Sequence, residues 1–318
     1  MRVISGLSEL ETIGLKNVAT TLGTFDGVHA GHRKIISTLR EIGQERDLEP
    51  VLVTFHPHPQ IVLGKRGPTE LLTTLEEKLK LLEGTNIGTV VILDFNRQLA
   101  SYAPENFVRE ILIQKMGMKA FVIGYDHAFG KDRSGNKELL SRMSQTDNFH
   151  FVVVPEFRIN NQNVKSTIIR ELLKTGEFEL ARRALGYNYF LTGKIIKGHG
   201  IGKTLGFPTV NLAVPPGKLL PKEGVYSAMA SFDGKRFPGM VYIGARLTFN
   251  DTALSVEVNL FDFKDKIDSG AATLELTGYI RPPEKFRNTE ELIEQMKNDE
   301  LEIRKRLGDE ILKQEAEN

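Results

Sequence analysis

Apolar positions in the first half of the chain follow two alternating patterns. Short runs rich in β-branched residues predict buried strands, and longer stretches with apolar residues every three or four positions predict helices. The strand-like runs cover residues 18–23, 51–55, 89–93, 120–124 and 151–154. Because strands alternate with helices of ordinary length, this half is predicted to form an α/β domain, a parallel sheet with helices on both faces.

Two of the predicted helices carry start signals. Thr74 and Glu77, three positions apart, form a capping box. The apolar stripe of the helix that follows consists of Leu75, Leu79 and Leu82. Pro104, at a first helical position, marks the start of another helix. Further helices are predicted at 34–44, 168–173 and 177–184.

The second half changes to closely spaced β-type runs broken by Gly, Pro and Asp. Asp233-Gly234 predicts a hairpin turn, because both positions favour positive φ. Strands are predicted at 225–232, 236–243, 254–261 and 273–280, and a helix at 289–307. These elements predict an antiparallel β-barrel or sandwich with a terminal helix. The change of pattern near Gly186 divides the chain into predicted domains of residues 1–185 and 186–318.

Composition narrows the function classes. A chain of 318 residues exceeds what one core usually supports, so two domains are expected. Lys and Arg number 42 against 41 Asp and Glu, a balance that argues against a nucleic-acid partner. With no cysteine, disulfides and thiolate chemistry are excluded. No apolar run has the length of a membrane span or a signal core, so we expect a cytoplasmic protein without a membrane partner, compatible with a homo-oligomer.

Residues 23–32, GTFDGVHAGH, lie where the first strand ends and the first long helix begins. In open α/β sheets ligands bind at such junctions, and a helix N-terminus favours anions. Glycines at 23, 27 and 31 would let backbone N–H groups approach a phosphate. His29 and His32 are spaced so that both can face that phosphate from the first helical turn.

Two other interpretations of this segment are possible. The glycines could only shape a tight turn beside two surface histidines. Alternatively, His29, His32, His56 and His58 could bind zinc, although no carboxylate follows at a spacing typical of a zinc site. Two histidines with a glycine between them at a strand-to-helix junction favour the phosphate site.

Four segments together resemble the bacterial bifunctional riboflavin kinase/FAD synthetase family. They are GTFDGVHAGH at 23–32, TFHPHP at 54–59, GYDHAFG at 124–130 and STIIR at 166–170. The resemblance implies a Rossmann-like nucleotidyltransferase domain that acts as an FMN adenylyltransferase. The family pattern differs at Lys165, where a serine is usual, and at His127, where an aromatic residue is common.

The chemistry of that reaction suits the residues present. The phosphate of FMN is already ionised near neutral pH, so attack on the α-phosphorus of ATP needs charge stabilisation rather than a strong base. By resemblance, His29 and His32 are catalytic. The resemblance also implies that the phosphates of ATP are bound by Gly23, Phe25, Gly27, Gly31, Ser166, Thr167 and Arg170. By the same resemblance, the residues that bind flavin and nucleotide are His56, Pro57, Asp126 and Phe129. Ser166 and Thr167 could also simply cap the following helix.

A second glycine-rich segment lies in the β-rich half. GHGIGKT at 198–204 is not a P-loop, because three residues rather than four separate Gly198 from Gly202 and no helix pattern follows. Residues 202–211, GKTLGFPTVN, instead resemble the flavokinase motif. Thr209 and Asn211 project from one face of an extended segment, where their oxygens could hold Mg²⁺. A polar barrel corner is the other interpretation.

The flavokinase resemblance implies ATP binding by a set of residues in this segment, and a general base. The ATP set is Gly202, Lys203, Gly206, Phe207, Pro208, Thr209 and Asn211. Transfer of the γ-phosphate to an alcohol requires removal of a proton, and by resemblance Glu257 accepts it. An exposed strand glutamate would show the same alternation. The chain departs from the family pattern at Tyr242, Leu247, Asn259 and Ser269.

The main hypothesis from the sequence is therefore an enzyme with two active sites that uses ATP twice and makes FAD from riboflavin through FMN. A rival hypothesis keeps only the adenylyltransferase and makes the barrel a weak or inactive kinase that binds flavin or mediates assembly. Other hypotheses are a nucleotide-sensing regulator without turnover, and a nucleotidyltransferase for another phosphorylated metabolite.

Overall fold

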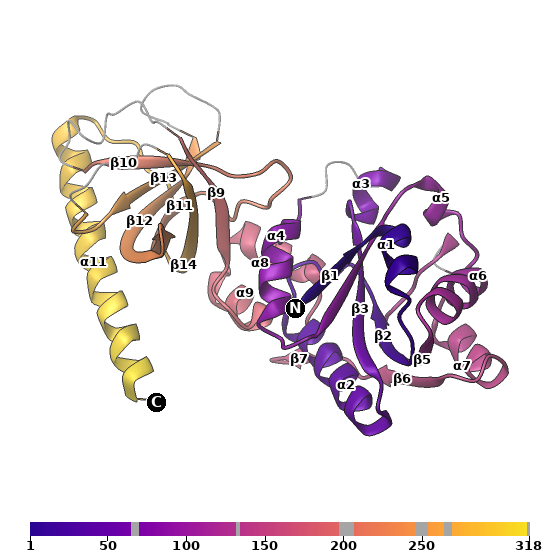
Figure 1. Cartoon of the computed structure of the whole chain (residues 1–318). Helices are drawn as coiled ribbons and strands as arrows, with labels where there is room; N and C mark the ends of the chain where they lie inside the picture. The colour runs from indigo at the N-terminus through magenta and orange to yellow at the C-terminus, as the bar shows by residue number, and fades with distance from the viewer. Residues whose placement is uncertain (65–69, 132–133, 197–206, 246–253, 264–268, 317–318) are drawn as a thin grey trace. The chain divides into compact units, whose positions relative to one another are not determined.

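The structure is a computed structural model of the whole chain (Figure 1). It describes residues 1–64, 70–131, 134–196, 207–245, 254–263 and 269–316, with side chains described as far as residue 308. Contacts divide the chain into two compact units, Met1–Ile168 and Ile169–Asn318. Within the described residues no helix is both long enough and apolar enough to cross a membrane.

The first unit is built on a six-stranded sheet in which every adjacent pair of strands is parallel. The strands are β1 (Arg2–Ser5), β2 (Val18–Leu22), β3 (Glu49–His56), β4 (Thr89–Asp94), β5 (Met118–Gly124) and β6 (His150–Val154). Their order is β1-β4-β3-β2-β5-β6. The chain therefore reverses its direction of winding at β2, between β3 and β5. Ligands of open α/β sheets bind outside the carboxyl ends of the strands at such a switch point.

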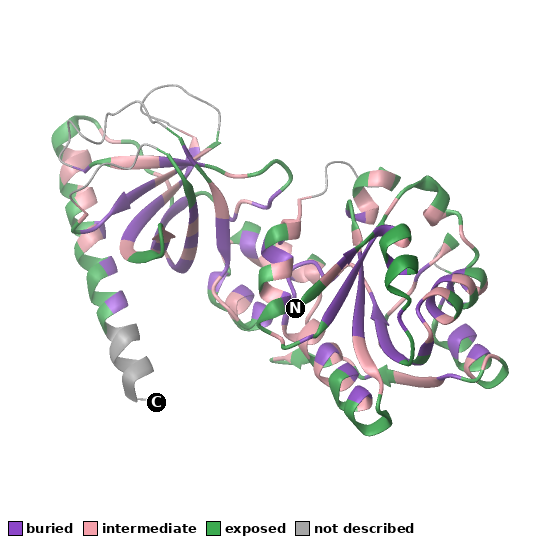
Figure 2. Ribbon diagram, in the orientation of Figure 1, coloured by how far each residue is buried: buried purple, intermediate pink, exposed green. Residues whose placement is uncertain are grey.

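Helices cover both faces of this sheet, as Figure 1 shows. The helical elements are α1 (Gly6–Ile13), α2 (Ala30–Arg46), α3 (Pro59–Leu63), α4 (Leu75–Glu83), α5 (Arg97–Ala100), α6 (Pro104–Asn106), the π-helix η1 (Phe107–Lys115) and α7 (Lys137–Thr146). Alternate residues of a strand pack into different apolar clusters on the two faces of the sheet. Val51 and Val53 of β3 belong to the cluster that includes residues of α1, η1 and α7, and Leu52 belongs to the cluster that includes residues of α2 and α4. In Figure 2 the strands β2, β4 and β5 are correspondingly purple along most of their length.

The second unit contains a closed antiparallel barrel in the order β10-β13-β12-β11-β14-β9. The strands are β9 (Phe190–Ile196), β10 (Thr209–Ala213), β11 (Gly224–Phe232), β12 (Lys235–Ala245), β13 (Leu254–Leu260) and β14 (Ala271–Arg281). Asp233 and Gly234 have φ of +47° and +72°, which confirms the predicted hairpin turn between β11 and β12. Of the two architectures predicted for this half, the barrel is the one observed.

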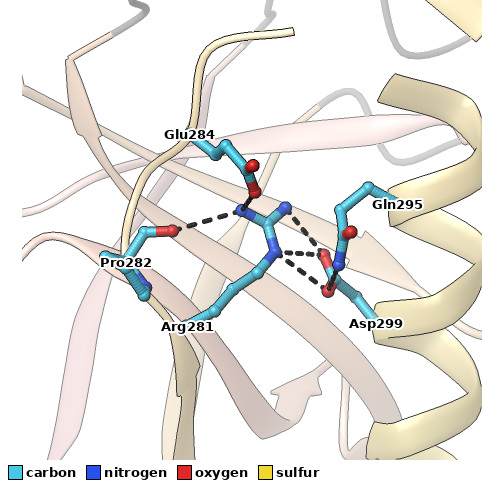
Figure 3. A network of polar contacts seen from close by, with 5 residues as sticks. All are labelled: Arg281, Pro282, Glu284, Gln295 and Asp299. Atoms are coloured by element: carbon cyan, nitrogen blue, oxygen red, sulfur yellow. Dashed lines mark hydrogen bonds and ion pairs between the residues drawn. The ribbon is translucent and has the colours of Figure 1, made fainter. Parts of the chain in front are cut away.

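Helix α11 (Thr289–Ala316) packs on the outside of the barrel. Ile303 and Leu307 of the helix form an apolar cluster with Val225, Met240 and Phe261. Beside this cluster Arg281, at the end of β14, makes a bidentate ion pair with Asp299 of α11, with N–O distances of 2.8–3.0 Å (Figure 3). Gln295 donates a further hydrogen bond to Asp299 at 2.8 Å.

Two helices connect the sheet to the barrel, α8 (Ser166–Thr175) and α9 (Phe178–Leu185). The division between the units falls inside α8. Residues beyond it contact the barrel: Lys222 N–H donates to Leu173 O at 2.9 Å, and the rings of Phe178 and Tyr226 lie 5.7 Å apart. Contacts thus group residues 169–185 with the barrel, whereas the sequence pattern changes only near Gly186. A two-stranded ribbon, β7 (Arg158–Ile159) with β8 (Gln162–Asn163), precedes α8.

The predicted strands and the architecture of both halves are confirmed, and the capping box of Thr74 and Glu77 is present at α4. Strand β1 and helix α1 were not predicted. β1 has four residues and only Ile4 among them is buried, so it carries little periodic signal.

Candidate active sites

The turn between β2 and α2 has an unusual backbone conformation. Phe25 and Val28 have φ of +47° and +34°, and Gly27 between them has φ of +81°. A positive φ is uncommon for non-glycine residues and is an outlier for a β-branched one such as Val28. Such strain persists only where the surroundings impose it, and it clusters at functional sites.

Buried hydrogen bonds impose this conformation. The carboxylate of Asp26, 2% exposed, accepts the backbone N–H groups of Leu72 and Thr73 at 3.1 and 3.0 Å, and the Thr73 hydroxyl at 3.2 Å. The Gly27 N–H in turn donates to the Thr73 hydroxyl at 3.1 Å. Asp26 O accepts the Ser166 hydroxyl at 2.9 Å. The segment before α4 and the start of α8 therefore hold the turn from two sides.

The two histidines of the turn form one unit. His29 is the N-cap of α2, and its Nδ1 accepts the backbone N–H of His32 at 3.3 Å. Their rings stack with centroids 3.6 Å apart and planes 15° apart. Gly31 makes this possible, because a Cβ there would lie 3.3 Å from the His29 ring. The sequence prediction that both side chains share the first helical turn is consistent with this geometry.

His32 is held neutral. Burial lowers its pKa well below the ordinary 6.5, and the positive charges of His29 and Lys78 lower it further. Its Nδ1 is buried and has no hydrogen-bond partner among the described residues. A buried polar atom without a partner is costly, and a ligand oxygen or a water that bonded to it would remove that cost.

Two glycines of the turn use their backbone N–H groups in hydrogen bonds within the protein. Gly23 N–H donates to Val53 O at 3.0 Å, as part of the sheet ladder, and Gly27 N–H donates to Thr73. Contact of these two N–H groups with a phosphate stays a prediction. Phe25 is 2% exposed, and its ring lies 5.0 Å from that of His32, so it supports the histidine pair from inside the core.

Other residues predicted for this site lie at or just after the ends of neighbouring strands. His56 and Pro57, joined by a cis peptide bond, are exposed at the end of β3. Asp126 follows β5 and its carboxylate pairs with Lys165 at 2.9 Å. Phe129 is 8% exposed and packs near Phe107 and Phe121, with ring centroids 5.8 and 6.4 Å away. Their contacts with ligand stay predictions.

The predicted residues of α8 fall on both sides of the division between the units. Ser166 belongs to the first unit and uses its hydroxyl to hold Asp26 O. Thr167 is exposed. Arg170 belongs by its contacts to the second unit, and its role at the histidine turn stays a prediction.

Sequence reasoning missed Lys78. This side chain lies on α4, is 6% exposed, and donates to Thr24 O at 2.9 Å and to the Thr54 hydroxyl at 3.2 Å. A signal was present, because Lys78 falls three residues after Leu75 and four before Leu82, on the apolar stripe of the helix. A cation on a buried stripe is unusual and calls for a partner.

In the barrel, strand pairing brings the predicted kinase residues together. Thr209 and Asn211 of β10 lie directly opposite Asn259 and Glu257 of β13. On the other side of β13, Glu257 lies opposite Tyr242 of β12. Directly opposed residues point to the same face of a sheet. Thr209, Asn211, Glu257, Asn259 and Tyr242 therefore share one face, which we call the kinase face.

The kinase face lies on the outside of the barrel. Met240, opposite Asn259, belongs to the cluster under α11, whereas the intervening Val256 and Val258 are 3% and 2% exposed on the other face. The Ser255 hydroxyl donates to Glu257 Oε1 at 3.2 Å, a contact that the sequence did not indicate.

Tyr242 stays protonated on this face. Burial raises its pKa, and the negative charges of Glu223 and Glu257 raise it further. Its hydroxyl donates to Ala245 O at 2.6 Å. Tyr242 thus places a neutral aromatic side chain beside Glu257.

Three of the predicted ATP-binding residues, Gly202, Lys203 and Gly206, lie outside the described residues, as do the rejected P-loop segment and Leu247. Phe207 is 7% exposed, and Pro208 O accepts the Asn259 side-chain amide at 2.9 Å. In the described part of the chain no group of three or more His, Cys, Asp or Glu side chains is arranged to hold a metal ion. Thr209 and Asn211 offer neutral oxygens instead.

Comparison with known proteins gives one pattern over both units. A family model described as FAD synthetase matches residues 13–168, and one described as riboflavin kinase matches residues 185–307. A protein of Bacillus subtilis strain 168 named bifunctional riboflavin kinase/FMN adenylyltransferase is 34% identical over 285 residues, covering 88% of this chain and 90% of its own. A protein of the same name from Buchnera aphidicola of Schizaphis graminum is 33% identical over 311 residues, covering 96% and 98%.

Among solved structures, one from Streptococcus pneumoniae superposes with a TM-score of 0.85 and 27% identity, covering 96% of this chain and 99% of its own. That protein is named as a macrolide-efflux protein.

Proposed function

Because this chain belongs to the family of bifunctional riboflavin kinases/FMN adenylyltransferases, we propose that it makes FAD from riboflavin in two steps that each consume ATP. The barrel phosphorylates riboflavin to FMN. The α/β unit then transfers the adenylyl group of a second ATP to FMN, which gives FAD and pyrophosphate. The substrates are riboflavin, FMN and ATP.

One observation carries the adenylyltransferase assignment: a strained turn at the switch point of the sheet presents two stacked histidines, and the buried Nδ1 of His32 has no hydrogen-bond partner in the part of the chain that the structure describes. An FMN phosphate oxygen attacks the α-phosphorus of ATP, and the bond to pyrophosphate breaks. Neutral His32 adds a hydrogen-bond donor without adding a charge. The N-terminus of α2 contributes its positive dipole to the same place.

The kinase step needs a base, because an alcohol keeps its proton near neutral pH. In this proposal Glu257 accepts the proton of the riboflavin 5′-hydroxyl while that oxygen attacks the γ-phosphorus and ADP leaves. The Ser255 hydroxyl, bonded to Glu257 Oε1, orients the carboxylate. Thr209 and Asn211 lie on the same face and orient the nucleotide.

The donor set of the kinase face fits Mg²⁺, a hard cation that takes oxygen ligands and keeps most of its water. The Thr209 hydroxyl and the Asn211 amide oxygen would hold the ion, which neutralises charge on the ATP phosphates. In terms of sequence, we assign the adenylyltransferase to residues 1–185, which include all of α8, and the kinase to residues 186–318. Cytoplasmic location and self-association stay predictions.

The test is a product analysis of the purified full chain with riboflavin, ATP and Mg²⁺, with flavins separated by chromatography. We expect FMN to appear first and FAD to follow. FAD from supplied FMN without any FMN from riboflavin would contradict the kinase assignment. FMN from riboflavin without FAD would contradict the adenylyltransferase assignment.

A further inference from the structure

Lys78 is a buried cation that its own helix does not need. The N-terminus of α4 is completed by the Thr74–Glu77 capping box, and Leu82 supplies a fully buried apolar contact. A leucine or methionine at position 78 would extend the apolar stripe. Burying an ammonium carries a desolvation cost that an apolar side chain avoids, so its presence points to a role outside the helix.

The contacts of Lys78 reach the ends of two strands at the histidine turn. Its Nζ donates to Thr24 O, two residues beyond the end of β2, and to the hydroxyl of Thr54, which is fully buried in β3. The Thr54 hydroxyl itself donates to Thr24 O at 3.2 Å. One ammonium thus joins the strand that leads into the turn with the strand that leads into the His56–His58 segment.

The charge of Lys78 also acts on the turn. Burial lowers the pKa of Lys78 to about 8, against an opposing effect from the negative charge of Asp26. The positive charge of Lys78 in turn lowers the pKa of His32 on α2. Among the described residues, Asp26 and His32 are the titratable groups coupled to Lys78, and β2 and β3 contribute the neutral Thr24 carbonyl and Thr54 hydroxyl.

We propose that Lys78 is a positioning residue for adenylyl transfer, which holds the base of the histidine turn in place and adds a positive charge beneath the site where the α-phosphate reacts. The inference rests on the proposed adenylyltransferase activity. Preorganised charge of this kind stabilises the transition state more than the bound substrate, so the loss of Lys78 lowers kcat more than it raises KM for ATP.

The test compares Lys78→Met with Lys80→Met in the full-length chain. Lys80 lies two residues along the same helix and is exposed, so it is a matched control. For Lys78→Met we expect kcat for FAD formation from FMN to fall by about 10- to 100-fold, with FMN formation from riboflavin unchanged and the melting temperature unchanged or raised. Lys80→Met is expected to behave like the wild type in all three measurements.

A pH profile separates positioning from a merely structural role. In the wild type, FAD formation should decline as the pH rises through about 8, where the ammonium loses its proton. This decline should be absent from Lys78→Met and should move to higher pH in Lys78→Arg. The arginine variant, which keeps a cation at this position, provides the same readout if the methionine variant does not fold.

Two results would overturn the inference alone: wild-type FAD formation in Lys78→Met, or the same alkaline decline in all three proteins. A wild-type protein that makes no FAD from FMN would overturn the proposed function instead, and the inference with it.

Discussion

The histidine turn and the kinase face, the two proposed phosphate sites, are built from different kinds of backbone. The turn carries left-handed φ values at Phe25, Gly27 and Val28, and buried polar contacts fix it. The kinase face lies on paired β10, β13 and β12, where regular register alone places Asn211, Glu257 and Tyr242 in a row.

The difference matches the two reactions. An ionised phosphate needs surroundings that stabilise charge at one place, and a rigid turn at a helix N-terminus provides that. An alcohol needs a base at a fixed distance from the nucleotide, and neighbouring strands set such spacings directly. The turn should therefore be sensitive to changes in its supporting contacts, and the kinase face to changes in single side chains.

The largest effect is expected at Glu257. Glu257→Gln removes the proton acceptor but keeps the shape of the side chain, so kcat for FMN formation should fall by about 10²- to 10⁴-fold. FAD formation from supplied FMN should not change. Chromatography of the two products measures both rates in one protein, and retained kinase activity would show that Glu257 is an ordinary strand residue.

On the other side of the comparison, His32→Ala should lower FAD formation from FMN by about 10²- to 10³-fold, because it removes a preorganised donor from the turn. FMN formation from riboflavin serves as the internal control and should persist. His150→Ala, a change at a histidine at the amino end of β6 and outside the turn, is the matched variant. Equal losses in both variants would remove His32 from its proposed role.

The second unit also contains a largely buried ion pair, in which the side chain of Asp299 is 2% exposed and that of Arg281 is 17% exposed. Asp299→Asn leaves Arg281 without its charge partner, and the free energy of unfolding of the barrel should fall by about 3–5 kcal/mol. Glu302→Gln is the control on the same helix, since its exposed pair with Arg306 should contribute only about 0.3–0.5 kcal/mol. Urea unfolding followed by circular dichroism measures both variants. Similar stability losses would mean that the Arg281–Asp299 pair does not anchor α11.

The smallest effect is a pH dependence of stability from His32. In the unfolded chain a histidine titrates near 6.5, whereas burial keeps the pKa of His32 well below that value in the fold. Between the two pKa values the unfolded chain binds more protons, so the free energy of unfolding falls as the pH drops through about 6.5, by at most about 1.4 kcal/mol per pH unit. His32→Asn should remove this contribution.

Urea unfolding at pH 7.5 and pH 5.5 checks this prediction. Burial also lowers the pKa of His150, but that contribution is common to both proteins and cancels in the comparison. Equal losses of stability in the wild type and His32→Asn would show that His32 is free to take up a proton in the fold.

By itself the sequence determined the architecture, and it predicted most of the candidate site residues. Continuous runs of apolar and β-branched residues reveal strands such as β2 and β3 because these strands are buried on both faces, and Asp233-Gly234 predicts its hairpin because the turn needs positive φ. The two histidines and the Thr209–Asn211 pair were visible because local spacing sets which face they share.

Only the tertiary structure decided what depends on contacts between distant segments. Asp26 holds the turn through its hydrogen bond to Thr73, which lies 47 residues away in the sequence. Lys78 donates hydrogen bonds to Thr24 and Thr54, which lie 54 and 24 residues away. Glu257 faces Asn211 only because β13 pairs with β10 in that register. The pattern of apolar residues along one segment is a local property that the sequence records, whereas buried hydrogen bonds and strand register depend on which distant groups the completed fold brings together.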